Sequence, residues 1–291
     1  MQGLIIKSFG RQFIVEVDGI NYQCVTKSKN TKYVVGDLVI VDLINNQQAQ
    51  IIELIPRRNL IYRSEKNRSK IIASNVNLIL IIIAVKPNFN MDFLNGCLIC
   101  SESQNIKPLI IINKTDLIET NKFKESIINL YQNQLGYNVL TLSAINNCDT
   151  LKPILENYTS LLIGQSGVGK STIINKIIPN AHTKTGEINK AQTSGTHTTT
   201  YATLYHIDNN SQIIDCPGLQ EFGLYHLDIE NLIEYFPELI KFKGKCRFRN
   251  CSHINDLGCA IVEAEKKGII DHNRLIYLQN LITTLQSKKN Y

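Results

Sequence analysis

One eight-residue motif, of the form G-x-x-x-x-G-K-[ST], narrows the possible folds of this chain more than any other stretch. It consists of Gly164, Gln165, Ser166, Gly167, Val168, Gly169, Lys170 and Ser171. An apolar segment precedes the motif and a helical pattern follows it, which predicts a strand, a loop and a helix of an α/β domain. The glycines allow backbone N–H groups to surround phosphate oxygens, and the amino-terminal end of the helix adds a favourable dipole. We therefore predict a nucleoside-triphosphate site rather than an ordinary glycine-rich turn.

The side chains that end this motif have distinct expected roles. Lys170 should contact the β- and γ-phosphates, and the Ser171 hydroxyl should bind Mg²⁺. Thr172, which begins the helical stretch, is expected to contact the nucleotide as well. Further along, Asp215 ends an apolar stretch and starts the sequence D-x-P-G, so it can bind the same Mg²⁺ while the Gly218 N–H contacts the γ-phosphate. The D-x-P-G sequence alone would indicate a plain turn. Its position after the phosphate motif favours a role in binding Mg²⁺ and the γ-phosphate.

A hydroxyl-rich loop, 195–200, lies between these two motifs and reads Gly-Thr-His-Thr-Thr-Thr. We predict that Thr199, or alternatively Thr198, is a second Mg²⁺ ligand, unless the segment is only a polar loop. Leu219 occupies the position where a Ras-like enzyme has a water-orienting glutamine, so hydrolysis without a partner is expected to be slow. His197 is the predicted catalytic residue that positions water; the alternative is a histidine that only packs in the loop.

A base-recognition motif is found before the phosphate motif, not after it. Asn113, Lys114, Thr115 and Asp116 follow the predicted strand 108–112 and resemble the N-K-x-D motif of GTPases. A fixed Asp116 carboxylate can accept hydrogen bonds from N1–H and the 2-amino group of guanine. Adenine lacks both donors, and sites built on such hydrogen bonds discriminate strongly. Asn113 is expected to brace the loops, and the Lys114 stem to cover the ring.

The order of the motifs is unusual. Ser143-Ala144, after the predicted strand 139–142, resembles the short guanine-O6 motif, and it also precedes the phosphate motif. The order N-K-x-D, S-A, phosphate loop, Thr loop and D-x-P-G resembles that of circularly permuted GTPases. Permutation is feasible because domain termini often lie close together at the surface. It makes residues 215–223 lead directly into the C-terminal region, so we hypothesise that nucleotide state reaches that region as an order–disorder change.

A cluster of soft ligands follows near the C-terminus. Cys246-x₄-Cys251-x-His253-x₅-Cys259 matches a closed structural Zn²⁺ set, and we expect one Zn²⁺ ion to fold this loop. The alternative is a group of unligated core cysteines. Cys97 and Cys100 also form a C-x-x-C pattern, but they lie in an apolar helical stretch and are predicted to be buried core residues.

The remaining sequence suggests three domains. Residues 1–70 show short β segments (4–8, 12–17, 20–26, 37–43 and 50–54), typical of a small barrel, and then a basic linker from residue 56 to about 70. Residues 71–223 alternate apolar strands (76–85, 108–112, 139–142 and 160–163) with helical patterns (91–103, 121–135 and 169–178), as in an α/β GTPase domain. Residues 224–291 are expected to form a mostly helical zinc-binding domain.

Composition sets broad limits. Apolar residues make up 43% of the chain, enough for a core, and the longest apolar run, 78–85, is far shorter than the roughly 20 residues of a membrane-spanning helix. No export signal is visible, so we expect a soluble, cytoplasmic protein. The net charge of +6 is concentrated in the flanking regions, which is a mild indication of a polyanionic partner.

Taken together, these features resemble the bacterial small-ribosomal-subunit biogenesis GTPases of the RsgA family, also called YjeQ or YloQ. The resemblance implies an N-terminal OB-fold barrel, a permuted GTPase domain and a zinc domain. It also implies a monomer that binds the 30S subunit and 16S rRNA late in assembly, with GTPase activity stimulated by the subunit. The position matching His197 is the proposed catalytic residue of the family. Asp256-Leu257-Gly258-Cys259 departs from the usual E-P-G-C.

Basic residues in two regions are candidates for rRNA phosphate contacts. They are Arg57, Arg58, Arg63, Lys66, Arg68, Lys70, Lys243, Lys245, Arg247 and Arg249. Two other functions stay open: a nucleotide-gated RNA-binding module in which hydrolysis is incidental, and an unrelated P-loop ATPase with a zinc ribbon. Asp116 argues against the ATPase.

Overall fold

The N-terminal region of the computed structural model is a closed β-barrel. The structure describes the chain except residues 11, 27–31, 66–67, 182–201, 217–221, 255 and 290–291. The barrel strands are β1 (Gln2–Phe9), β2 (Gln12–Val17), β3 (Ile20–Thr26), β4 (Leu38–Leu43) and β5 (Gln48–Leu54). They pair in the order β1-β2-β3-β5-β4 and close through β1 and β4. Side chains alternate between the barrel interior and solvent, which confirms the predicted barrel.

The central region is a mostly parallel sheet. Its strands are β8 (Leu78–Ile83), β9 (Lys107–Ile112), β10 (Asn138–Thr141), β11 (Thr159–Gly164), β12 (Thr203–His206) and β13 (Gln212–Asp215). They run in the order β10-β9-β8-β11-β13-β12, with only β12 antiparallel to its neighbour. Strand β8 is apolar throughout and β9 is apolar and buried from Leu109 to Ile112, because helices cover both faces of the sheet.

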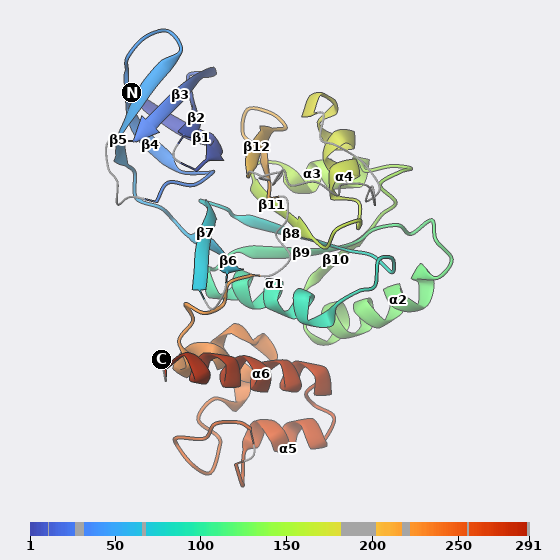
Figure 1. Ribbon diagram of the computed structural model, residues 1–291. Coiled ribbons are helices and arrows are strands. Elements are labelled where there is room, and N and C mark those ends of the chain that lie inside the picture. The colour runs from blue at the N-terminus through green and yellow to red at the C-terminus, as the bar shows by residue number, and fades with distance from the viewer. Residues whose placement is uncertain are drawn as a thin grey trace, which may run out of the picture.

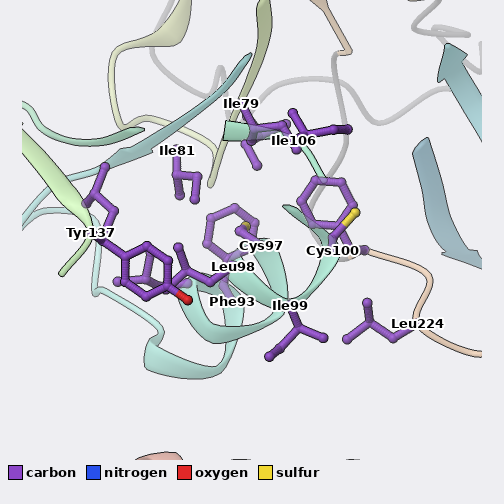
Figure 2. Packing of buried hydrophobic residues seen from close by; sticks show 14 of the residues in the cluster. Ile79, Ile81, Phe93, Cys97, Leu98, Ile99, Cys100, Ile106, Tyr137 and Leu224 are labelled. Atoms are coloured by element: carbon purple, nitrogen blue, oxygen red, sulfur yellow. The ribbon is translucent and has the colours of Figure 1, made fainter. Parts of the chain in front are cut away.

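Helices of the central region lie on opposite faces of this sheet (Figure 1). They are α1 (Met91–Ser103), α2 (Thr120–Ile127) with a π-helical continuation (Ile128–Gln134), α3 (Lys152–Leu155) and α4 (Lys170–Ile177). Asn90 caps α1, because its side-chain oxygen accepts from the backbone of Asp92 and Phe93. Cys97 and Cys100 are buried in α1, as predicted, and Figure 2 shows them in the core with Ile99 and Leu224.

The barrel and the central sheet are joined edge to edge. Lys7 of β1 pairs with Thr203 of β12, so one sheet runs from the barrel into the α/β region. The segment expected to be a basic linker is instead largely a β-hairpin, β6 (Leu60–Glu65) and β7 (Arg68–Ser74). Ile61 and Ala73 of this hairpin are fully buried in the core that also holds α1. Burial of these apolar side chains explains why the segment is ordered despite its charges.

The C-terminal region packs beneath α1 (Figure 1). It contains the 3₁₀-helices η4 (Ile229–Tyr235) and η5 (Pro237–Phe242) and the α-helices α5 (Ala260–Lys266) and α6 (His272–Lys289). Arg274 of α6 is 1% exposed; its Nε donates to Glu238 at 2.7 Å and its Nη1 to Asn95 of α1 at 3.0 Å.

No helix in the described part of the chain is both long and apolar enough to span a bilayer.

Replacing Arg274 by methionine is expected to lower the free energy of unfolding by about 3–5 kcal/mol. Glu238, which is 9% exposed, would then be a buried charge without its counter-ion. Denaturant unfolding followed by circular dichroism measures the loss. The double variant Arg274→Met, Glu238→Gln should recover part of it, and an equal loss in both variants would contradict this electrostatic explanation.

Candidate nucleotide site and metal cluster

The predicted nucleotide-binding residues gather at one edge of the sheet. Asn113 follows β9, Ser143 comes shortly after β10, Gly164 ends β11 and Asp215 ends β13. These strands are parallel through β8, so their carboxyl ends meet at the same edge. In open α/β sheets, ligands bind in the crevice at this edge. Motifs that lie in permuted order along the chain are therefore neighbours in space.

Asn113 links three of these motifs. Its Nδ2 donates to the Val168 carbonyl of the phosphate loop at 2.8 Å, and its Oδ1 accepts from the Ala144 N–H at 2.9 Å. Asn113 is only 2% exposed. These two hydrogen bonds are the contacts that the predicted bracing role requires. Gly169 has φ +103°, and an added Cβ would lie 2.3 Å from the Asn113 amide nitrogen, so both conformation and space require glycine there.

The phosphate loop surrounds the lysine that ends it. The Lys170 ammonium donates to the carbonyls of Gly164 and Gln165 at 2.7 and 2.9 Å. Burial lowers the pKa of Lys170, and the nearby Asp215 carboxylate opposes that shift. Val168 is buried beneath the loop, while Ser171 and Thr172 lie in the first turn of α4. Ser166 and Gly167 are exposed, so the loop presents its polar backbone at the surface.

The carboxylate expected to recognise guanine is held from one side. The Ser143 hydroxyl donates to Asp116 Oδ1 at 2.6 Å. The Thr120 hydroxyl donates to the Lys114 carbonyl at 2.9 Å, which stabilises the turn in which Lys114 has φ +62°. Thr115 donates its N–H to the Leu142 carbonyl, next to the Ser143-Ala144 pair. The predicted residues thus share one surface, on which Asp116 is exposed to solvent.

A further wall of this site was not among the predicted residues. Lys114 Nζ donates to the Lys86 carbonyl at 3.0 Å, and the Pro87 ring lies so near Gly167 that a Cβ added there would be 3.6 Å from Pro87 Cδ. The loop after β8 therefore lies between the base motif and the phosphate loop. The sequence gives one signal for this loop. It directly follows the longest apolar run, which forms β8, the strand between β9 and β11.

Asp215 fits the chemistry of a magnesium site. It is 8% exposed, and its Oδ1 has no hydrogen-bond partner among the described residues. Burial raises the pKa of Asp215 to about 6, although Lys170 lowers it. A hard cation such as Mg²⁺ would supply positive charge and a ligand contact for this carboxylate oxygen. The other predicted phosphate or metal contacts, Gly218, Thr199 and the alternative Thr198, lie outside the described residues, as does the predicted catalytic residue His197.

The predicted soft-ligand cluster is assembled in the C-terminal region. The ligand atoms of Cys246, Cys251, His253 and Cys259 all lie within 4.8 Å of one another. His253 Nδ1 is 3.6 Å from Cys246 Sγ and 3.4 Å from Cys259 Sγ. Ligands around a tetrahedral Zn²⁺ would be roughly 3.5–3.8 Å apart. The cluster can hold a metal ion, and Gln279 of α6 supports it by donating to the His253 carbonyl at 2.8 Å.

The basic residues predicted to contact RNA are in different environments. Arg57 forms a bidentate ion pair with the fully buried Asp37, at 2.6 and 2.7 Å, so it stabilises the barrel. Arg63 is half-buried, and Lys243 pairs with Glu234. The side chains of Lys66 and Arg68 are not described. The exposed members of the set are Arg58, Lys70, Lys243, Lys245, Arg247 and Arg249.

Comparisons with known proteins agree with this arrangement. The family model "RsgA GTPase" matches residues 54–225. The small ribosomal subunit biogenesis GTPase RsgA of Nitrosospira multiformis is 40% identical over 99% of this chain and 92% of that protein. The protein of the same name from Nitrosomonas europaea is 41% identical over 98% of this chain and 92% of its own length.

Two solved structures share the fold. The structure of YjeQ from Thermotoga maritima has a TM-score of 0.75 and 23% identity, and covers 98% of both chains. The structure of YloQ, described as a circularly permuted GTPase, has a TM-score of 0.71 and 24% identity, and covers 99% of this chain and 95% of its own. With the family match and the full-length relatives, the conclusion is that the chain belongs to the RsgA family of GTPases, which are GTP hydrolases.

Proposed function

We propose that this chain binds the 30S ribosomal subunit and acts as a late-stage assembly and release switch driven by GTP hydrolysis. The names of its full-length relatives support the ribosomal role. The observation that carries the nucleotide-binding part is the pair of hydrogen bonds from Asn113, because they join the base motif to the phosphate loop and to Ala144. Such a partner implies action in the cytoplasm.

The residues have separate roles in the proposed reaction. Asp116 and Ser143 would bind the guanine edge, and the phosphate loop with Lys170 would hold the phosphates. Ser171, Thr199 and Asp215 would bind Mg²⁺, which when bound neutralises charge on the phosphates. His197 would position the attacking water, and the Gly218 N–H would contact the γ-phosphate. Because these groups orient the phosphates and water rather than form covalent bonds, positioning supplies most of the catalysis.

The flanking domains would supply the ribosomal contacts. We propose the division 1–70, 71–223 and 224–291, with the barrel and the exposed basic residues facing 16S rRNA phosphates. We also propose that the metal in the Cys₃His cluster is Zn²⁺, because three thiolates and an imidazole favour it. A monomer that cycles between GTP and GDP states fits a protein that must leave the subunit. The alternative is a nucleotide-gated RNA-binding module in which hydrolysis is incidental.

Turnover with and without purified 30S subunits, using GTP and ATP in parallel, tests this function. We expect slow hydrolysis of GTP alone and a rise of roughly 10²-fold with 30S subunits, the scale of a newly positioned general base. ATP should not be hydrolysed under either condition. Absence of stimulation, with 30S binding still dependent on GTP, would favour the RNA-binding module.

A further inference from the structure

The chain that follows the D-x-P-G motif is held against the β6–β7 hairpin. Phe222 forms an antiparallel bridge with Arg63 of β6. The Gly223 N–H donates to the Tyr62 carbonyl at 3.0 Å. The rings of Tyr62 and His226 stack, with centroids 4.2 Å apart and planes 28° apart. Residues 222–226 are therefore attached to an edge of this hairpin by backbone and ring contacts.

The hairpin is itself fixed on two sides. The Leu60 N–H donates to the Gln104 side chain at the end of α1, at 3.2 Å. On the barrel side, the Ser74 hydroxyl donates to Asp37 at 2.6 Å, and Asn75 donates to the Gly36 carbonyl at 2.8 Å. The barrel-side contacts join buried groups and the contact to Gln104 is partly buried, so the hairpin is held on both sides.

The same stretch of chain is also fixed at its beginning. Asp215 is the last residue of β13, where it pairs with Leu162 of β11 and Thr203 of β12. The sequence predicts the γ-phosphate contact between these two fixed points. The contacts that fix residue 215 and residues 222–226 reduce the conformational entropy cost of placing a predicted γ-phosphate contact between them. The hairpin contact is thus placed to assist recognition of the γ-phosphate without touching the nucleotide.

We propose that Tyr62 is a positioning residue for GTP hydrolysis, which acts by stacking on His226 and so fixing the chain on the carboxyl side of the D-x-P-G motif. Tyr62 would contribute to binding of the triphosphate and to turnover, and not to binding of GDP. The residues predicted to bind the base and the α- and β-phosphates are positioned by other contacts, because Asn113 bonds to Val168 and Ala144, and Asp116 to Ser143. The inference requires only that the chain hydrolyses GTP.

Affinities for GDP and for a non-hydrolysable GTP analogue, together with single-turnover hydrolysis at saturating GTP, test this role in the full-length protein. Tyr62→Ala should weaken analogue binding and slow hydrolysis by about 3- to 10-fold, the range for losing one aromatic pair, with GDP affinity changed less than about twofold. Tyr62→Phe keeps a stacking ring and should behave as the parent protein does.

Tyr158→Ala is the matched control. Tyr158 is also a half-buried tyrosine, but it precedes β11 at the opposite edge of the sheet, where its ring lies 5.7 Å from the Lys107 ammonium. This variant should lower the melting temperature without changing the ratio of analogue to GDP affinity. His226→Leu should reproduce Tyr62→Ala, and the double variant should add little more. An unchanged affinity ratio and rate in folded Tyr62→Ala, or an equal change in the Tyr158 control, would overturn the proposal.

Discussion

Replacing Asp116 by alanine is expected to weaken GDP binding by about 10⁴-fold, because the N1–H and 2-amino donors of guanine would lose a charged acceptor. The variant should lose its preference for guanine over adenine nucleotides, since neither base would then meet a partner. Calorimetric titration with GDP and ADP measures both changes. The fold should be unaffected, because Asp116 is exposed and its described contact is the Ser143 hydroxyl.

Asp116→Asn separates loss of a contact from a change of specificity. Asparagine offers one acceptor and one donor where aspartate offers two acceptors. Xanthine carries an oxygen at C2 where guanine carries an amino group, so its edge matches asparagine. We expect this variant to bind xanthosine diphosphate more tightly than GDP. Tight GDP binding by Asp116→Asn would show that the base lies elsewhere.

Two further variants calibrate this test. Ser143→Ala removes the hydroxyl that orients Asp116 at 2.6 Å, and should weaken GDP binding by roughly 10-fold, as expected for one hydrogen bond to a charged group. Asp42→Asn changes an exposed carboxylate of the barrel and should have no effect. A loss at Asp42 equal to that at Asp116 would point to a general effect of charge.

Motif spacing predicts which residues lie together at the candidate nucleotide site, because these residues belong to loops that directly follow strands. The base motif, the Ser143-Ala144 pair and the phosphate loop each follow a strand, and parallel strands bring their carboxyl ends together whatever their order in the chain. Asn113 could be assigned its bracing role for this reason. The Cys₃His cluster can also be predicted from the sequence, because its ligands lie within one short stretch. Cys97 and Cys100 could be placed in the core from the apolar helix around them.

Contacts between distant segments could not be predicted in this way. The segment from residue 56 to about 70 resembles a linker in the sequence because its charges conceal Ile61, and the burial of Ile61 beside Ala73 depends on α1 and the barrel. Arg57 looked available for RNA, since nothing nearby in sequence shows that its partner is the buried Asp37. The Lys86–Pro87 wall was missed because it contributes a carbonyl and a ring edge, which no side-chain motif records.

Removal of the proposed zinc ion is expected to unfold the loop that carries its ligands and to leave the nucleotide site intact. Structural zinc contributes on the order of 10 kcal/mol to small metal-dependent folds, and the stretch 243–258 has few buried apolar side chains of its own. Cys251→Ser should therefore reduce bound zinc from about one ion per chain to none. Hydrogen exchange should rise across residues 245–259, while GDP affinity stays unchanged.

The loss of structure should stop at α6. Leu278 and Arg274 of this helix are buried in the core shared with α1, and Arg274 donates to Asn95, so tertiary packing holds the helix without metal. Its amides should remain protected after chelation, whereas α5, which begins directly after the ligand Cys259, should lose protection. Cys24→Ala, a buried cysteine of the barrel outside the cluster, should retain zinc and serves as the control. Full protection of residues 245–259 in zinc-free Cys251→Ser protein would contradict a structural role for the metal.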